Sequence, residues 1–339
     1  MTSFKMRACL SVFIVTLFGA TSLYGQLSDF SCIDFKKADS IAQLYPLHPL
    51  EDLKILSDKL TKPLSTDVEK LRSIFKWVCT NIESDYELFV ENKNMRRKLS
   101  GEKLRRWEKK FSERVFNIMT AQHRTICTGY AYLVKELAFH AGLNCIIVDG
   151  YSRHALSNIG GSGVVNHSWN AVELDGEWYL CDPTWSSGVI DSRQRTFVKR
   201  FDDAYFLPEP IMFGRSHYPL DTKWMLQEKK PGLQTFLNAP LIYIGSFRYG
   251  IAPLTPASFE IQVPRGSIVP FQFTTAGGKE ISKMALYVEN VRTNEPFAKE
   301  LNGSVATCST NHKFPHKGKY AVHIVVDGSH VLTYSVRVQ

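Results

Sequence analysis

The pair Asp175-Gly176, which lies between two apolar runs, constrains the fold more than any other feature of the chain. An Asp-Gly pair in this setting favours a two-residue turn that joins antiparallel strands. With this turn, residues 164–174 pair with residues 177–182, so that Leu174 lies opposite Glu177 and Trp169 lies opposite Asp182. The sequence therefore predicts a β-hairpin at the centre of the chain.

This hairpin brings a histidine close to a carboxylate. In the predicted register His167 faces Thr184, and Asp182 is its diagonal neighbour on the same face of the sheet. Diagonal neighbours lie roughly 7–8 Å apart, which is within reach of an imidazole and a carboxylate. A carboxylate that orients an imidazole is part of the arrangement that activates a nucleophile.

The nucleophile that we predict is Cys127, which stands where an irregular segment turns into a helix. Apolar residues follow it at helical spacing, including Ala131 and Val134, and Gly142 is a stop signal. The unpaired N–H groups at such a helix start favour thiolate over thiol and can hold a developing oxyanion. Cys127, His167 and Asp182 are therefore the predicted catalytic residues.

Each of these three residues also has an ordinary structural explanation. Lone cysteines are most often inert and buried, lone histidines are usually satisfied by hydrogen bonds, and Asp-Pro-Thr commonly opens a turn. Their joint occurrence, with the histidine and the aspartate brought together by one predicted turn, favours catalysis.

Residues 1–25 resemble a secretory signal, with Lys5 and Arg7 at the charged start, an apolar run, and a cleavage site before Gln26. The run is short for a bilayer span, and no later stretch reaches spanning length. We therefore expect a soluble mature chain that is secreted or periplasmic and has no stable membrane span. A retained membrane anchor is the competing interpretation.

Charge and cysteine content exclude several classes of function. Loss of Lys5 and Arg7 with the signal lowers the formal charge from +8 to +6, and no nucleic-acid-binding module is present. Without a CxxC motif, and with Pro315 between His312 and His316, we expect no metal, and we expect no cofactor. Six cysteines remain, and their spacing matches no disulfide framework: Cys32, Cys79, Cys127, Cys145, Cys181 and Cys308.

The segments before Cys127 are predicted to be helical. Residues 26–65 form a helical lead-in that Pro46 and Pro49 interrupt, and a clearer helix begins at the capping box of residues 66–69. Residues 93–114 carry ten Lys or Arg, yet their apolar residues recur every three or four positions, which predicts one amphipathic helix. Its charged face is either simply solvated or a surface that captures anionic partners beside the nucleophile.

Three blocks of the sequence resemble the signature of the transglutaminase-like superfamily, in the order Cys, His, Asp. They are Ile126-Cys-Thr-Gly-Tyr-Ala131, Asn166-His-Ser-Trp-Asn-Ala-Val172 and Glu177-Trp-Tyr-Leu-Cys-Asp-Pro-Thr-Trp185. Asp85-Tyr86, the run from Arg200 to Pro208, His217-Tyr-Pro219 and Trp224 are similar to the kyphoscoliosis-peptidase branch. The resemblance covers residues 66–228, less than half of the chain.

The resemblance implies an α+β, papain-like core in which a helix bearing the cysteine packs against an antiparallel sheet bearing the histidine and the aspartate. It implies Cys127 as nucleophile, His167 as general base and acid, Asp182 as the group that orients His167, and Trp169 and Trp185 as walls of the site. Thr125 departs from the glycine that is common two residues before the cysteine, so its side chain is expected to narrow access or alter the loop. Gln122 and Trp107 are the candidate oxyanion donors.

Beyond Pro231 the sequence changes to short alternating runs, the last two of which flank another Asp-Gly pair at residues 327–328. These runs predict a small β-sandwich of immunoglobulin-like type over residues 236–339, after a catalytic domain over residues 66–232. Such a domain either binds targets or substrate or is a packing appendage.

Three functions follow from these expectations. The first is an exported cysteine peptidase or amidase that acts on protein or peptide amides through a thioester, or a transglutaminase if an amine replaces water. The second is an inactive binding or scaffold protein of the same fold, for which Thr125 is the hint. The third is an amidase for a non-protein amide, such as a glycan-linked asparagine or a cell-wall peptide. The sequence does not distinguish hydrolysis from transfer to an amine, and we favour hydrolysis because the branch that the chain resembles is named for it.

Overall fold

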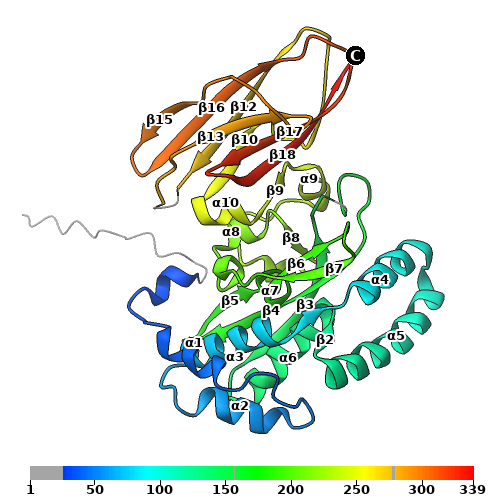
Figure 1. The fold of residues 1–339 in the computed structure, drawn as a ribbon, viewed down its shortest axis with the longest axis vertical. Helices are drawn as coiled ribbons and strands as arrows, with labels where there is room; N and C mark the ends of the chain where they lie inside the picture. The colour runs from blue at the N-terminus through cyan, green and yellow to red at the C-terminus, as the bar shows by residue number, and fades with distance from the viewer. Residues whose placement is uncertain (1–25, 156, 277–278) are drawn as a thin grey trace, which may run out of the picture.

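The computed structural model describes residues 26–155, 157–276 and 279–339, so the predicted signal segment of residues 1–25 lies outside the described residues. The chain folds into an α+β part followed by a two-sheet β-sandwich, which confirms the predicted fold class. Figure 1 shows the sandwich, coloured yellow to red, above the α+β part. No helix within the described residues combines the length and the apolar character needed to cross a membrane.

The N-terminal helices share one core with the rest of the α+β part. They are η1 (Leu27–Phe30), α1 (Lys36–Gln43), α2 (Leu53–Thr61) and α3 (Asp67–Asn81). Helix α3 begins with the predicted capping box between Thr66 and Glu69, and its apolar face is buried. Leu56 and Leu60 of α2 are buried in the same cluster as Leu71 of α3. Residues 26–65 therefore pack as an integral layer of the core.

The basic stretch forms two helices, so the prediction of a single helix was wrong. They are α4 (Tyr86–Lys98) and α5 (Gly101–Gln122). Between them Gly101 adopts a φ of +54°, a left-handed conformation that glycine tolerates and that lets the chain reverse. Phe111 and Val115 of α5 are buried together with Leu88 of α4. In Figure 1 the two helices, drawn in cyan, form a hairpin at the side of the molecule.

Helix α6 (Cys127–His140) packs against an antiparallel sheet with the strand order β5-β4-β3-β8. The strands are β3 (Cys145–Ser152), β4 (His167–Leu174), β5 (Glu177–Cys181) and β8 (His217–Pro219). The predicted turn at Asp175-Gly176 is present, with positive φ at both residues. Strand β3 runs through Gly150, which lets β3 and β8 approach closely. A Cβ atom there would lie 2.2 Å from the backbone oxygen of Tyr218.

Shorter elements surround this sheet. Strand β1 (Glu83–Ser84) pairs in parallel with β2 (Arg124–Thr125), directly before α6, and β6 (Gly188–Asp191) forms a hairpin with β7 (Thr196–Lys199). The others are helical: α7 (Pro183–Ser187), η2 (Asp203–Tyr205), α8 (Pro210–Phe213), η3 (Thr222–Met225), α9 (Leu233–Asn238) and α10 (Ile244–Tyr249).

The sandwich consists of one sheet with the order β10-β12-β16-β15 and a second with the order β11-β18-β17-β13-β14, in which β9 also pairs with β18. Its strands are β9 (Leu241–Ile242), β10 (Ile251–Thr255), β11 (Glu260–Val263), β12 (Ile268–Thr275), β13 (Met284–Val288), β14 (Val291–Arg292), β15 (Ala298–Asn302), β16 (Val305–Lys313), β17 (Gly318–Val326) and β18 (Ser329–Val338). The first of the alternating runs beyond Pro231, residues 240–247, is β9 followed by helix α10 and not a single strand. Phe271 and Tyr334 are fully buried in the core between the sheets.

Arg153 ties the α+β part to the chain that enters the sandwich. Its side chain is only 1% exposed, and its guanidinium donates hydrogen bonds to the backbone oxygens of Asn158, Ala239 and Pro240. Burial lowers the pKa of Arg153 to about 10, so the group keeps its positive charge at neutral pH. The two parts are thus joined by a buried cation.

Candidate active site

Cys127 is the first residue of α6 and is 9% exposed. No side chain caps this helix start, so its first N–H groups lie beside the thiol. Burial is the largest influence on the thiol and acts to raise its pKa. The hydrogen bond and positive charge of His167, together with a backbone hydrogen bond from Ser168, outweigh burial and lower the pKa of Cys127 below its ordinary value. The site therefore favours thiolate.

His167 forms the predicted pair with Asp182. Its Nε2 lies 2.7 Å from Oδ2 of Asp182, and both side chains are buried. Burial disfavours the imidazolium, but the negative charge and hydrogen bond of Asp182 and the contact with Cys127 raise the pKa of His167 to about 10. Burial also disfavours the carboxylate, yet the positive charge of His167 and the hydrogen bonds of both histidines hold the pKa of Asp182 well below its usual range. His167 thus contacts Cys127 on one side and Asp182 on the other, and its positive charge stabilises the negative charge of both groups.

The predicted strand register holds only as far as β5 continues. Pairs run from Leu174 and Glu177 to Asn170 and Cys181, as predicted. Beyond Cys181 the chain leaves the sheet, so His167 pairs with Gly150 of β3 and does not face Thr184.

The strand ends there because Pro183 begins α7. Asp182 caps this helix, with Oδ1 accepting the backbone N–H groups of Thr184 at 2.9 Å and Trp185 at 3.1 Å. The cap leaves Oδ2 for His167. A helix cap, and not a strand pair, thus orients the carboxylate.

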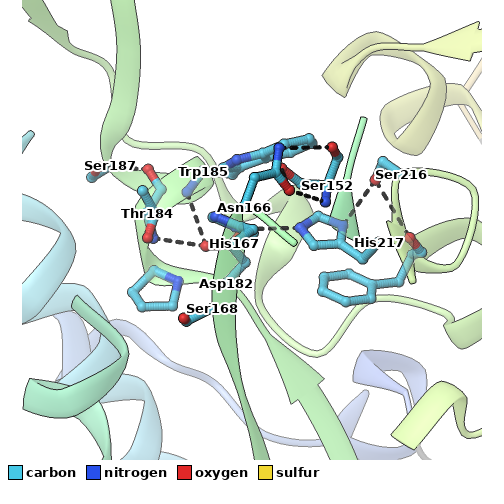
Figure 2. A network of polar contacts seen from close by, with 12 residues as sticks. Ser152, Asn166, His167, Ser168, Asp182, Thr184, Trp185, Ser187, Ser216 and His217 are labelled. Atoms are coloured by element: carbon cyan, nitrogen blue, oxygen red, sulfur yellow. Dashed lines mark hydrogen bonds and ion pairs between the residues drawn. The ribbon is translucent and has the colours of Figure 1, made fainter. Parts of the chain in front are cut away.

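His217 is a functional candidate that sequence reasoning missed. Its Nε2 lies 3.0 Å from the same Oδ2 of Asp182, and its ring stacks on Phe213 with centroids 3.9 Å apart. Figure 2 shows His217 between Asp182 and Ser216, whose hydroxyl lies 2.9 Å from Nδ1. Burial lowers the pKa of His217 to about 4, although Asp182 acts against this, so the ring is neutral at pH 7. The sequence pointed to His217 only through the similarity of the run His217-Tyr-Pro219 to the kyphoscoliosis-peptidase branch, which did not indicate what the histidine does.

A cavity of about 770 Å³ opens onto Cys127 and His167. Its walls come from α4, the loop of residues 152–166, the β6–β7 hairpin and residues 241–244. Ile126, Trp185 and Phe197 are among the apolar lining residues. A cavity of this size with a partly apolar lining is typical of a ligand-binding site.

The sequence model described as "Transglutaminase-like superfamily" matches residues 54–183, which contain all three residues of the predicted triad. The chain contains a transglutaminase-like domain. Kyphoscoliosis peptidase of Mus musculus is 30% identical over 234 residues, which are 68% of this chain and 32% of the relative. Kyphoscoliosis peptidase of Homo sapiens is 33% identical over 207 residues, covering 60% and 28%. The chain therefore spans about a third of the length of these relatives.

Two more distant similarities complete the comparison. Hillarin of Drosophila melanogaster is 27% identical over 235 residues, covering 65% of this chain and 26% of the relative. The solved structure "Crystal structure of a TGase" aligns with 50% of this chain and 35% of its own, with 15% identity and a TM-score of 0.26.

The predicted walls of the transglutaminase-like site are placed unequally. Trp185 lines the cavity, with its ring centroid 5.6 Å from that of His167. Trp169 is fully buried beneath the site, with its ring 5.2 Å from that of His217, and it does not line the cavity. Trp169 therefore supports the site from the core and does not contact a ligand.

Neither candidate oxyanion donor lies at the site. Gln122 is exposed at the C-terminal end of α5, and Trp107 stacks on Phe111 in the α4–α5 hairpin, so both predictions were wrong. Upstream of Cys127, the cavity is lined instead by Ser84 of β1, by residues of α4 and by Ile126. The N–H groups at the start of α6 remain as the available donors.

Thr125 does not obstruct access to the site. Its side chain is fully buried and packs against Gly129, where a Cβ atom would lie 1.9 Å from the Thr125 hydroxyl oxygen. It is not among the residues that line the cavity. Thr125 therefore gives no indication of an inactive site, because its side chain packs against Gly129 and lies outside the cavity lining.

The described residues contain one group with the spacing of metal ligands, namely His167, Asp182 and His217. The two Nε2 atoms lie 2.7 and 3.0 Å from one carboxylate oxygen, which are distances of N–H···O hydrogen bonds. The arrangement is that of a hydrogen-bonded cluster. All six cysteines of the described residues are free, so none of them forms a disulfide.

We expect His217 to make stability depend on pH. The folded protein holds His217 neutral down to about pH 4, whereas an unfolded histidine gains a proton below about pH 6.5, so stability falls as the pH drops through this window. In His217→Gln this contribution is absent. Urea unfolding at several pH values should show wild type more stable than the variant at pH 7, with the difference shrinking towards pH 4.

His154, whose pKa burial also lowers to about 4, contributes in the same direction but is unchanged in the variant. The stability that comes from the raised pKa of His167 is constant below about pH 6.5 and is lost only as the pH rises towards about 10, so it does not vary in this window. A difference between wild type and His217→Gln that stays constant from pH 7 to 4 would contradict this account.

Proposed function

We propose that this protein is a cysteine-dependent acyl-transfer enzyme that cleaves amide bonds of peptides or proteins. The observation that supports it most is that Cys127 and His167 line one cavity while the buried Asp182 contacts His167, with the pKa of the thiol lowered and that of the imidazole raised. Two of the relatives are named kyphoscoliosis peptidase, which favours water as the acceptor. Export of a chain that begins near Gln26 remains part of this proposal.

The proposed reaction has two steps. The Cys127 thiolate attacks the amide carbonyl, and His167 gives its proton to the departing amine as the C–N bond breaks, which leaves a thioester. Water then attacks the thioester, His167 takes a proton from it, and the carboxylic acid leaves as the C–S bond breaks. A primary amine in place of water gives a new amide instead.

The fold supplies the other requirements of this chemistry. The N–H groups at the start of α6, which no side chain caps, are the proposed donors to the carbonyl oxygen as it becomes negative. Asp182 binds Nε2 of His167, which leaves the other ring nitrogen, Nδ1, for Cys127. His217, held by stacking on Phe213, limits the movement of Asp182.

Thiol labelling tests the proposal. We expect iodoacetamide to alkylate Cys127 faster than the exposed Cys32, and the rate at Cys127 to stay high below pH 8, because the lowered pKa extends the thiolate to lower pH. In His167→Ala the hydrogen bond and positive charge of His167 are lost, while burial, the largest influence, still raises the pKa of the thiol, so the midpoint of the pH profile should move above that of an ordinary thiol. Mass spectrometry of peptides gives the rate at each cysteine.

Cys32 is the internal reference in both proteins, because it is exposed and distant in sequence from the site. Equal labelling rates at Cys127 and Cys32, unchanged in His167→Ala, would favour a binding protein that keeps the fold without the chemistry.

A further inference from the structure

The cavity beside Cys127 is lined by positive charges and no negative ones. Five of its lining residues are basic, and neither Asp nor Glu lines it: Lys93, Arg96, Arg97, Arg153 and Arg200. The chain as a whole has 41 basic and 33 acidic residues, so a lining of this size without a single carboxylate departs from the average composition. The cavity is therefore a local region of positive potential.

Most of this charge is not neutralised by neighbours. Arg96 pairs with Glu108 at 2.9 Å, but within the described chain no carboxylate lies at ion-pair distance from Lys93, Arg97 or Arg200. Arg153 is bound by backbone oxygens, which leave its charge intact. The exposed Arg97 and Arg200 and the buried Arg153 therefore all make the potential in the cavity more positive.

The cations come from two separate elements of the cavity wall. Lys93 and Arg97 lie one turn apart on α4, and Arg200 follows β7 on the β6–β7 hairpin. The hairpin is joined to α4 by the ion pair between Arg195 and Glu87 at 3.5 Å. A ligand in the cavity therefore meets positive charge from both elements.

The inner surface is apolar and includes residues of the sandwich. Phe89, Trp185 and Phe197 line it from the transglutaminase-like domain, and Leu241 and Ile242 of β9 close it from the other side. Since β9 pairs with β18, the sandwich contributes directly to the cavity. Apolar side chains near the reacting amide and negative charges further out would match this surface.

We propose that the substrate is an acidic peptide segment, with Asp or Glu side chains flanking an apolar residue at the amide that Cys127 attacks. This inference rests on the proposed function and adds the class of substrate. The carboxylates would contact Lys93, Arg97 and Arg200, and the apolar residue would pack against Trp185 and β9. The amphipathic basic helices thus capture an anionic partner beside the nucleophile.

Two alkylating agents that differ in charge test this inference without a known substrate. Iodoacetate carries a carboxylate and iodoacetamide is neutral, and in both cases the thiolate displaces iodide. We expect the ratio of the iodoacetate rate to the iodoacetamide rate at Cys127 to fall about three- to tenfold in the double variant Lys93→Gln/Arg97→Gln, because local positive potential raises the concentration of anions. The iodoacetamide rate should change little.

The matched control is Lys109→Gln/Lys110→Gln on α5. It removes the same net charge from the same hairpin, but both residues are exposed and neither lines the cavity. At about 0.15 M salt, where screening acts over roughly 8 Å, the control should keep the wild-type ratio. An equal fall in both double variants, or no fall in either, would overturn the inference.

A second measurement uses peptides. Blocked hexaglutamate should protect Cys127 from iodoacetamide at concentrations where blocked hexaglutamine does not, and this protection should be lost in Lys93→Gln/Arg97→Gln. Equal protection by both peptides would overturn the acidic preference. Failure of the proposed function looks different, since Cys127 would then show no enhanced iodoacetamide rate at all.

Discussion

Replacement of Cys127 with alanine is expected to lower acyl transfer by about a thousandfold or more, because the covalent intermediate cannot form. The substitution removes one sulfur atom at the wall of an open cavity, so the free energy of unfolding should change by less than about 1 kcal/mol. Incubation with an unfolded protein mixture, followed by mass spectrometry of new chain ends, measures hydrolysis. Adding a labelled primary amine measures transfer to an amine in the same experiment.

Cys32→Ala is the matched control, since that thiol is exposed and its loss should leave the product yield unchanged. New chain ends in the presence of amine would support a peptidase, and amine adducts on glutamine would support a transglutaminase. The same products at the same rate from Cys127→Ala would refute a cysteine mechanism.

Replacement of Asp182 with alanine is expected to damage both activity and stability. Its two oxygens accept hydrogen bonds from His167, His217 and the backbone of Thr184 and Trp185, and the side chain is fully buried. Alanine leaves these donors buried without an acceptor, so the free energy of unfolding should fall by about 3–5 kcal/mol. Activity should fall about 10⁴-fold, because His167 loses the group that orients it.

Asp182→Asn separates the two effects. Its amide oxygen can still accept the N–H groups of Thr184 and Trp185, so the α7 cap is retained and the stability loss should be smaller. Its NH₂ group cannot accept from two imidazoles, so activity should fall as in the alanine variant. Asp221→Ala, which removes an exposed cap at η3, controls for cap loss alone and should cost about 1 kcal/mol. An Asp182→Ala protein as stable as Asp221→Ala would contradict the network.

Local patterns gave the elements that carry the proposed triad. The capping box at Thr66, the helix that begins at Cys127 and the turn at Asp175-Gly176 were all predictable, because each depends on residues within a few positions of one another. The break at Gly101 was not, because apolar spacing continues across it and a positive φ has no signature in periodicity.

The placement of the walls and donors was less predictable. Trp169 and Trp185 have similar sequence surroundings, yet one is in the core and the other lines the cavity, because the chain leaves the sheet between Cys181 and Pro183. Gln122 is near Cys127 in sequence, but the end of α5 directs it to solvent. Proximity along the chain therefore did not give proximity at the site.

The sequence by itself determined an α+β domain with a nucleophile at a helix start and a histidine and an aspartate on one hairpin, followed by a β-sandwich. Periodicity, caps and turns are local, so they can be recognised without coordinates. Only the tertiary structure decided that His217, 35 residues beyond Asp182, contacts the same carboxylate oxygen as His167. It also decided that α4 lines the cavity with cations and β9 lines it with apolar side chains. These contacts join segments that are far apart in the chain, and their geometry depends on how the whole core packs.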